Sequence, residues 1–433
     1  MAAFDQLALC PELQYTLQQL GYQQMTAIQE KAIPVILAGR DVLAQAQTGT
    51  GKTAGFALPI IEKLQQSVVA DHNYHQVRAL ILTPTRELAI QVAEKTLSYG
   101  EQLGMRVIAV YGGVRFDNQI RKMKRGADIL VATPGRLLEM LIQKKISLKN
   151  LQILVFDEAD RMLDLGFIHD INRIMSFAPK QRQTLLFSAT FNEKIENWAQ
   201  QVLNSPLKIQ VAVKNSVVKE VQQIAYKVGN NSKEELLCHL IKSGNWQQTL
   251  VFTRTKRRAD KVTAALLAEG INALAIHGDK LQKERITALT EFSNRQIDVL
   301  VATDVAARGL DIAALPRVVN FDLPNQPEAY IHRIGRTARA GKTGQAISFV
   351  APDEKAYLQE IELLIVKKLQ FHSIPMLEKG KLSSEKIAGI KRANNKPQRK
   401  TAKAHFIAPD LDKPSKPALR PSLISTKAKR KKT

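Results

Sequence analysis

The sequence of 433 residues has only two cysteines and no long apolar run. Cys10 and Cys238 are too few for a disulfide framework, and nothing near them has the spacing of a metal site. No uninterrupted apolar stretch approaches the ~20 residues that a membrane-spanning helix needs. Residues 1–5 also lack the basic and apolar regions of a secretion signal. These absences favour a protein of the reducing cytoplasm.

Acidic residues are scarce as well, because 40 Asp and Glu stand against 63 Lys and Arg, for a formal net charge of +23. From Lys379 to Thr433 there are 17 basic residues and three acids, so this segment alone carries +14. Its many prolines and few aromatic residues are typical of disorder. The charge indicates a polyanionic partner, most commonly a nucleic acid. A tail that only aids solubility is the alternative.

Short β-rich runs alternate with helical stretches, which predicts parallel sheets covered on both faces. A first set of strands is expected at residues 42–44, 79–83, 107–111, 129–132, 153–157 and 184–188. A second set is expected at residues 249–253, 273–277, 299–302, 318–322 and 346–350. Residues 207–216 between the sets are interpreted as a hinge. We therefore predict two similar α/β domains, at 1–212 and 218–370, and a disordered basic tail at 371–433.

Two motifs in the first half indicate a nucleoside-triphosphate site. The first is a glycine-rich phosphate loop between a strand and a helix, which consists of Ala46, Gln47, Thr48, Gly49, Thr50, Gly51, Lys52 and Thr53. Its N–H groups can cradle phosphates, Lys52 can reach the terminal ones, and the Thr53 hydroxyl can ligate a metal. The second is Asp157-Glu158-Ala159-Asp160, after the apolar run 151–156. It supplies carboxylates that can hold magnesium and orient a water.

With these motifs, the chain resembles the DEAD-box RNA helicases of superfamily 2 over residues 4–365. The other motifs that carry the resemblance are Pro84-Thr85-Arg86-Glu87-Leu88, Gly112-Gly113, Thr133-Pro134-Gly135-Arg136, Ser188-Ala189-Thr190, Val251-Phe252-Thr253-Arg254-Thr255, the run 302–311 and the run 332–339. Residues 244–248 and 161–164 resemble the bacterial RhlE-type branch. The resemblance implies two tandem RecA-like domains.

The resemblance also implies roles in ATP hydrolysis with Mg²⁺. Asp157 would hold the hydrated metal with Thr53, and Glu158 would accept the proton of the attacking water. Lys52 and His332 would contact the terminal phosphates, and Arg336 and Arg339, three apart on one helical face, would be arginine fingers. Gln29 would read adenine and Phe4 would stack on it. Gly309 and Asp311 would complete the ATP site from the second domain.

RNA would lie across both domains, held through phosphates and 2′-hydroxyls without sequence preference. The matching positions are Thr85, Arg86, Gly113, Thr133 and Arg136 in the first domain and Arg254, Gly278 and Thr303 in the second. Ser188 and Thr190 would couple the domains. Two departures from the family pattern are Leu281, where a small polar residue is usual, and Ala338, where glycine is common.

The expected activity is RNA-stimulated ATP hydrolysis that unwinds short RNA duplexes locally, in ribosome assembly or RNA turnover, with ribonucleoprotein or RNA-decay partners. A translocating DNA helicase is an alternative. The sequences of the Gln29 segment and of residues 157–160, which resemble the DEAD-box motifs, disfavour it. A second alternative, from another class, is an RNA clamp or annealing chaperone in which ATP only regulates the grip.

Overall fold

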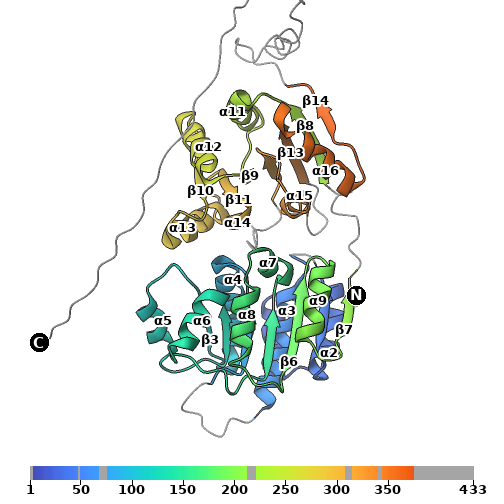
Figure 1. The fold of residues 1–433 in the computed structure, drawn as a ribbon, viewed down its shortest axis with the longest axis vertical. Coiled ribbons are helices and arrows are strands. Elements are labelled where there is room, and N and C mark those ends of the chain that lie inside the picture. The colour runs from blue at the N-terminus through green and yellow to red at the C-terminus, as the bar shows by residue number, and fades with distance from the viewer. Residues whose placement is uncertain are drawn as a thin grey trace, which may run out of the picture. The chain divides into compact units, whose positions relative to one another are not determined.

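The structure, a computed structural model, describes residues 3–46, 49–67, 76–211, 221–307, 315–338 and 344–374. We call residues 3–211 the first lobe and residues 221–374 the second lobe. Each lobe contains one seven-stranded sheet with helices on both faces (Figure 1). The pairings within both sheets are parallel. The predicted fold class, two tandem RecA-like α/β domains, is confirmed.

The first sheet has the strand order β3-β4-β2-β5-β6-β1-β7. Its strands are β1 (Val42–Gln45), β2 (Ala79–Leu82), β3 (Val107–Val110), β4 (Ile129–Ala132), β5 (Ile153–Phe156), β6 (Gln183–Ser188) and β7 (Leu207–Gln210). The inner strands β2, β4, β5 and β6 are buried throughout. Strands β2, β4 and β5 are continuous apolar runs because helices cover both of their faces, while β6 also buries Gln183, Thr184 and Ser188.

Alternate residues of these strands face opposite cores. Ala79 and Ile81 pack with one group of helices, and Leu80 and Leu82 with the other. The first group is α1 (Pro11–Gln19), α2 (Ala27–Leu37), α3 (Lys52–Gln66) and α4 (Arg86–Gly100). The second group is α5 (Phe116–Met123), α6 (Pro134–Ile142), α7 (Ala159–Asp164), α8 (Ile168–Met175) and α9 (Glu193–Val202).

The second sheet has the order β10-β11-β9-β12-β13-β8-β14. Its strands are β8 (Val221–Lys227), β9 (Thr249–Thr253), β10 (Ala273–Ile276), β11 (Val299–Thr303), β12 (Arg317–Asn320), β13 (Gly344–Val350) and β14 (Gln370–His372). Its helices are α11 (Lys233–Ser243), α12 (Lys256–Ala268), α13 (Gln282–Ser293), α14 (Asp304–Ala307), α15 (Pro327–Ile334) and α16 (Lys355–Ile365). Short 3₁₀ helices are η1 (Phe4–Gln6), η2 (Glu101–Leu103), η3 (Asn230–Ser232) and η4 (Pro352–Glu354).

Three strands are absent from the sequence-based prediction. Strand β7 was interpreted as the start of a hinge, which is wrong, because residues 207–210 pair with β1 at the sheet edge. Strand β8 buries Gln223 beside the apolar Val221 and Ala225, so it lacks a continuous apolar signal. Strand β14 is exposed along its length and includes residues 371 and 372, which the sequence places in the tail. These strands lie at or next to sheet edges, where apolar patterning is weakest.

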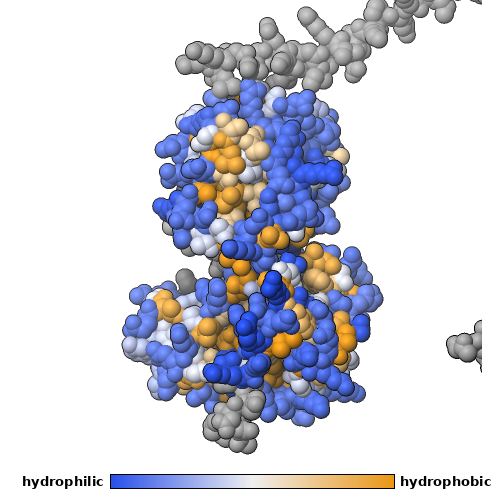
Figure 2. All heavy atoms as spheres, turned by 90° about the vertical axis from the view of Figure 1, so that its left-hand side faces the viewer, coloured by the Kyte–Doolittle hydropathy of each residue, from blue (hydrophilic) through white to orange (hydrophobic). Residues whose placement is uncertain are grey.

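The face of the molecule drawn in Figure 2 is mainly polar. Figure 2 shows hydrophilic residues over most of the visible face, with apolar residues gathered in separate patches. Among the helices of the described ranges, none is long and apolar enough to cross a membrane. The tail predicted from composition falls outside the described residues from residue 375 onward.

Candidate functional site

The motifs of the first lobe follow strands that are neighbours in the sheet. The phosphate loop begins after β1, the run 157–160 begins after β5, and Ser188 ends the strand β6 that lies between them. Because all three strands are parallel, their carboxyl ends share one edge of the sheet. Open α/β sheets bind ligands at this edge.

The phosphate loop turns sharply into helix α3. Gly49 and Gly51 have φ values of 84° and 87°, in the left-handed region that favours glycine. A Cβ on Gly51 would lie 2.5 Å from Nε2 of Gln29, so this position has no space for a side chain. Helix α3 begins at Lys52, and its first N–H groups have no partner within the helix, an arrangement that can bind an anion. Gln47 and Thr48 lie outside the described residues.

Lys52 and Asp157 lie opposite each other in this site. Nζ of Lys52 is 3.7 Å from Oδ1 of Asp157, and both residues are buried. Neither atom has a hydrogen-bond partner in the described part of the chain. Burial raises the pKa of Asp157 to about 6, while the Lys52 ammonium opposes the rise. Since buried charges need close partners, this pair suits a phosphate at Lys52 and a cation at Asp157.

The donor set fits magnesium. Thr53 and Asp157 line the same cavity of about 160 Å³ and offer a hydroxyl and a carboxylate. Within the described ranges, no group of three or more His, Cys, Asp or Glu residues could hold a metal by itself. Mg²⁺ keeps several waters and binds through one or two protein oxygens and substrate phosphates, so it does not need such a group.

Glu158 occupies a strained position beside Asp157. Its φ of 55° and ψ of 54° are left-handed, and it is the N-terminal cap of α7. This conformation costs roughly 1–2 kcal/mol for a residue with a Cβ. Such strain concentrates at functional sites, where it aims a side chain. Glu158 also lines the cavity of the phosphate loop, so its carboxylate is placed where a water can be oriented.

Asp160 connects this run to Ser188-Ala189-Thr190. Its Oδ2 accepts hydrogen bonds from the backbone N–H groups of Ala189 and Thr190, both at 3.1 Å, and from the Thr190 hydroxyl at 3.2 Å. The Ser188 hydroxyl donates to the Thr190 carbonyl at 2.7 Å. The sequence predicts a role for Ser188 and Thr190 but none for Asp160, although Asp160 is the fourth residue of the acidic motif.

Gln29 joins the start of α2 to the phosphate loop. Its Oε1 accepts from the N–H of Thr26 at 2.8 Å, and its Nε2 donates to the Gly51 carbonyl at 3.1 Å. A side-chain amide has two acceptor sites and two donor protons. One acceptor site and one donor proton therefore remain after these two bonds.

Phe4 lines a neighbouring cavity of about 370 Å³. Its ring meets Tyr22 edge to face at 5.6 Å, and the Tyr22 hydroxyl is 2.7 Å from that of Tyr99. The same cavity is lined by Gln14, Gln18 and Gly21. Aromatic rings and side-chain amides in one cavity are suited to binding a planar heterocycle.

The residues that the sequence assigns to RNA in the first lobe follow the other half of the sheet. Thr85 comes after β2, Gly113 after β3 and Thr133 after β4, and these strands are adjacent in the order β3-β4-β2. Gly113 has a φ of 79°, and a Cβ there would lie 2.0 Å from Nη1 of Arg86. Arg86 therefore packs directly on the glycine turn.

Arg136 is fixed beside the same turn. Its guanidinium donates to the Val114 carbonyl at 3.2 and 3.3 Å and to Oε1 of Gln119 at 3.3 Å. It also pairs with Glu139 at 3.0 Å and lies 5.3 Å from the Phe116 ring centre. The phosphate loop and Asp157 thus lie on one half of the carboxyl edge of the first sheet, and the first-lobe residues assigned to RNA lie on the other half.

The second lobe has a similar arrangement. Arg254 follows β9, Gly278 follows β10 and Thr303 ends β11, and these strands are adjacent in the order β10-β11-β9. Gly278 has space limited by Lys256, whose Cε would be 3.4 Å from an added Cβ. The three residues assigned to RNA therefore share one half of the carboxyl edge of this sheet.

The segment after β12 carries the residues assigned to the γ-phosphate, His332, Arg336 and Arg339. His332 lies in α15, but α15 ends at Ile334 and Gly335 caps it. The prediction that Arg336 continues a helical face is therefore wrong. Beyond the end of the helix, the N–H of Leu315 donates to the Arg336 carbonyl at 3.0 Å, and Leu315 forms a parallel bridge with Thr337. Arg339, Gly309 and Asp311 lie outside the described residues.

Arg333 is a residue that the sequence-based prediction missed. It is 1% exposed and forms a bidentate pair with Asp304, in which both N–O distances are 2.7 Å. It also donates to Oδ1 of Asn320 at 3.2 Å and to the Asp322 carbonyl at 2.6 Å. Arg333 thus attaches α15 to the ends of β11 and β12, a role that only three-dimensional contacts reveal.

Both departures from the family pattern have structural consequences. Ala338 has a φ of 51°, in the left-handed region, which explains why glycine is suited to this position. Leu281 is 70% exposed and precedes α13, and its N–H donates to Oε2 of Glu284 at 2.7 Å. The helix start is therefore capped by Glu284 without help from a polar side chain at residue 281.

A phosphate loop, an acidic strand end and two RecA-like sheets define a nucleoside-triphosphate hydrolase of tandem α/β type. Comparison with known protein families identifies two of them. Residues 26–198 match the DEAD/DEAH box helicase family, and residues 232–341 match the helicase conserved C-terminal domain. The chain belongs to the DEAD-box ATP-dependent RNA helicases and is an ATPase.

The relatives are similar over nearly the whole described chain. The DEAD-box ATP-dependent RNA helicase CshA of Geobacillus kaustophilus is 42% identical over 394 residues, which cover 91% of this chain and 83% of that protein. CshA of Listeria monocytogenes is 44% identical over 86% of this chain and 70% of that protein.

Among solved structures, S. cerevisiae Dbp5 bound to RNA and ADP BeF3 is 32% identical, with a TM-score of 0.77 over 86% of this chain and 95% of that one. The helicase Mss116 bound to ssRNA and UDP-BeF is 28% identical, with a TM-score of 0.79 over 91% of this chain and 83% of that one.

Proposed function

We propose that this helicase hydrolyses ATP in response to single-stranded RNA and thereby opens short RNA duplexes locally, without sequence preference. One observation carries the proposal: the phosphate loop and Asp157 follow β1 and β5, and the first-lobe candidate RNA residues follow β2, β3 and β4 of the same sheet. Similar structures hold RNA and nucleotide analogues together, Dbp5 with ADP BeF3 and Mss116 with UDP-BeF.

In this proposal Lys52 binds the β- and γ-phosphates, and Thr53 and Asp157 hold Mg²⁺, partly through water. The bound magnesium would neutralise charge on the phosphate oxygens. Glu158 then orients the attacking water and accepts its proton. The rest of the loop (Ala46, Gln47, Thr48, Gly49, Thr50 and Gly51) surrounds the phosphates with N–H groups. Arg336 and Arg339 would supply positive charge from the second lobe, and His332 would link the γ-phosphate to the neighbouring motifs. Gly309 and Asp311 would complete the ATP site, with Asp311 at the ribose.

Adenine would be read by Gln29 and stacked by Phe4. The donor and the acceptor that remain on the Gln29 amide match N7 and the N6 amino group of adenine. Guanine presents two acceptors at the corresponding edge, so it would leave the Gln29 acceptor unpaired. The hydrogen bonds to Thr26 and Gly51 fix the orientation of the Gln29 amide. The fixed amide then discriminates adenine from guanine.

Gln29→Ala should therefore lower the preference for ATP over GTP by roughly tenfold or more, because the penalty on an unpaired buried group disappears. Competition of GTP against ATP in the hydrolysis assay measures this. Gln19→Ala, on the exposed end of α1, is the control. Gln29→Ala also removes a capping bond, so its melting temperature is measured in parallel. An unchanged preference together with a lower melting temperature would assign Gln29 to structure alone.

RNA would be held by its backbone through Thr85, Arg86, Gly113, Thr133 and Arg136 on the first lobe, and through Arg254, Gly278 and Thr303 on the second. Hydroxyls, guanidinium groups and glycine N–H groups can all contact phosphates or 2′-hydroxyls. Ser188 and Thr190 would communicate the state of the ATP site to RNA; Asp160 bonds to Thr190, and the Ser188 hydroxyl bonds to the Thr190 carbonyl.

The basic tail is expected to add non-specific RNA affinity. Deleting residues 379–433 removes +14 charges. If a few of them touch RNA, the slope of log affinity against log salt should flatten by roughly 2, since each contact to a single strand contributes about −0.7. Fluorescence-anisotropy titrations at several salt concentrations measure this slope. Hydrolysis at saturating RNA should change little. An unaltered slope would indicate that the tail does not bind RNA and only aids solubility.

We further propose a first domain of residues 1–212 and a second domain from residue 218 that includes β14, since residues 371 and 372 pair with β8, with the tail after it. We also propose a cytoplasmic location and a role in ribosome assembly or RNA turnover with ribonucleoprotein partners. The two sheets and their separate family matches support two domains. The RhlE-type branch suggested by residues 244–248 and 161–164 stays a prediction, since the relatives described above carry the name CshA.

An RNA clamp or annealing chaperone is the competing function. Single-turnover release of a labelled strand from a short RNA duplex, with the protein in excess, separates the two. Unwinding predicts ATP-dependent release that becomes sharply slower as the duplex lengthens, because opening is local. A clamp predicts ATP-dependent retention of RNA with no release, and an annealing chaperone predicts faster strand pairing.

A further inference from the structure

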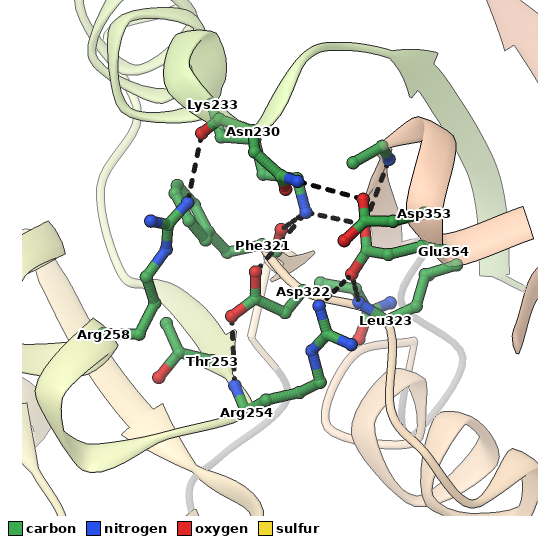
Figure 3. A network of polar contacts seen from close by, with 12 residues as sticks. Asn230, Lys233, Thr253, Arg254, Arg258, Phe321, Asp322, Leu323, Asp353 and Glu354 are labelled. Carbon is green, nitrogen blue, oxygen red and sulfur yellow. Dashed lines mark hydrogen bonds and ion pairs between the residues drawn. The ribbon is translucent and has the colours of Figure 1, made fainter. Parts of the chain in front are cut away.

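A buried network of charges lies where β9 ends in the second lobe (Figure 3). Its centre is Glu354, the last residue of η4, whose exposed fraction is 0%. Oε1 of Glu354 is 3.0 Å from Nη2 of Arg254, and Oε2 is 2.7 Å from Nζ of Lys233, which is also fully buried. One carboxylate is thus shared between two cations that are 21 residues apart in the sequence.

The Glu354 carboxylate is held rigidly. Besides its two cationic partners, Oε1 accepts from the N–H of Leu323 at 3.0 Å and Oε2 accepts from the N–H of Ala351 at 3.0 Å. Each oxygen therefore has one backbone donor and one cation. A carboxylate with both oxygens bonded to the main chain cannot rotate without losing those bonds.

Lys233 uses all of its hydrogen-bonding capacity in the same network. Its ammonium donates to the Phe321 carbonyl at 2.8 Å, to Oε2 of Glu354 at 2.7 Å and to Oδ1 of Asp322 at 3.4 Å. An ammonium has three protons, so none remains for a ligand. Lys233 therefore neutralises the negative charge of the buried carboxylates and cannot bind a ligand. Arg254 is the cation of this network that can still bind one.

Arg254 is held on several sides and is still accessible. Its backbone N–H donates to Oδ2 of Asp322 at 3.1 Å, and its guanidinium lies 5.4 Å from the ring centre of Tyr357. Its side chain is 25% exposed, in contrast to the fully buried Lys233 and Glu354. A guanidinium has five N–H donors, and Glu354 engages only part of them. The remainder can bind a phosphate.

We propose that Glu354 is a positioning residue for RNA binding: it fixes the Arg254 guanidinium before an RNA phosphate arrives. This inference rests on the proposed role of Arg254 in binding the RNA backbone. Buried ion pairs contribute little net stability compared with apolar replacements, whereas they can specify geometry. A long side chain that is ordered in advance loses less rotamer freedom on binding, which strengthens affinity without changing the chemistry of hydrolysis.

The test uses the full chain and single-stranded poly(U) RNA as the activator of ATP hydrolysis. Glu354→Gln keeps the shape and removes the charge. It should raise the half-saturating RNA concentration about 3- to 10-fold, the range expected for one side chain released from order, while the maximal rate stays within about twofold. Arg254→Ala should raise the same concentration by at least as much. In the Arg254→Ala background, Glu354→Gln should add nothing, because Glu354 acts only through Arg254.

Two further variants keep the outcome interpretable. Glu234→Gln is the control, since Glu234 pairs with Arg258 and Lys261 in the same lobe and does not contact Arg254. It should leave the RNA dependence unchanged. Glu354→Gln could fail to fold because Lys233 loses its charged partner. In that case the double variant Lys233→Gln with Glu354→Gln, in which both side chains are neutral, replaces Glu354→Gln in the comparison with Arg254→Ala.

The possible results are distinct. If Arg254→Ala leaves the half-saturating RNA concentration unchanged, the proposed role of Arg254 fails, and the positioning role with it. If Arg254→Ala weakens RNA binding but the charge-removing variant lowers only the melting temperature, Glu354 is structural and the positioning role is wrong. Additive effects of the two changes on RNA affinity would also overturn it.

Discussion

Glu158→Gln is expected to lower the rate of ATP hydrolysis by about 10²–10⁴-fold, the contribution of a positioned general base. The amide can still hold a water, but it cannot accept the proton of that water. The substitution preserves the size of the side chain, and Gln at residue 158 faces the same left-handed backbone as Glu. ATP and RNA binding should therefore persist, and the protein should accumulate as a long-lived complex with both.

Steady-state hydrolysis and the lifetime of the RNA complex in ATP test this expectation together. Glu193→Gln, an exposed carboxylate at the start of α9, is the matched control and should retain the parental values of both. Turnover by Glu158→Gln at close to the parental rate would show that another group accepts the proton. Loss of ATP binding instead would indicate that Glu158 supports the phosphate loop.

Arg336→Ala is expected to slow hydrolysis by about 10³-fold, the lower end of the range for arginine fingers, because Arg339 is still present. The positive charge is needed where negative charge develops in the transition state, so ATP affinity should change much less than the rate. Arg336 is 3% exposed in the described structure, so the melting temperature must be compared as well.

Single-turnover hydrolysis and ATP titrations separate the two effects. Arg336→Lys keeps the charge but loses the planar fork, and an intermediate rate is expected for it. Arg257→Ala, at an exposed position of α12, is the control for the loss of one positive charge from the second lobe. A defect confined to ATP affinity would rule out the finger role and leave Arg336 as a ground-state ligand.

Much of the fold could be predicted because its strands are continuous apolar runs. Strand β5 has the sequence Ile-Leu-Val-Phe and is buried on both faces. Such a short, wholly apolar run predicts a buried strand of a parallel sheet. Strand β8 pairs with β13 and β14, yet its Gln223 is buried and accepts a hydrogen bond from the Tyr330 hydroxyl. A buried glutamine satisfied by a tyrosine 107 residues away has no local signature.

The candidate site could be predicted only where a motif is contiguous. The phosphate loop and residues 157–160 are readable because neighbouring residues act on the same ligand. Asp160 binds the backbone of Ala189 and Thr190 about 30 residues away, and Glu354 meets Arg254 across a hundred residues. The spacing of Arg336 and Arg339 predicts one helical face, but α15 ends at Ile334, and the Arg336 carbonyl accepts from the N–H of Leu315. Such contacts depend on which strands are neighbours, which the sequence does not state.

The central claim is that ATP and RNA bind to coupled sites and that RNA triggers hydrolysis. The most direct measurement is the affinity for single-stranded RNA with and without a non-hydrolysable ATP analogue, paired with the affinity for that analogue with and without RNA. Thermodynamic linkage requires both affinities to rise by the same factor, and a typical coupling of 1–3 kcal/mol corresponds to about 5- to 150-fold. Equal factors within this range are expected, together with hydrolysis that is slow until RNA is added. Nucleotide affinity and hydrolysis that are indifferent to RNA would contradict it.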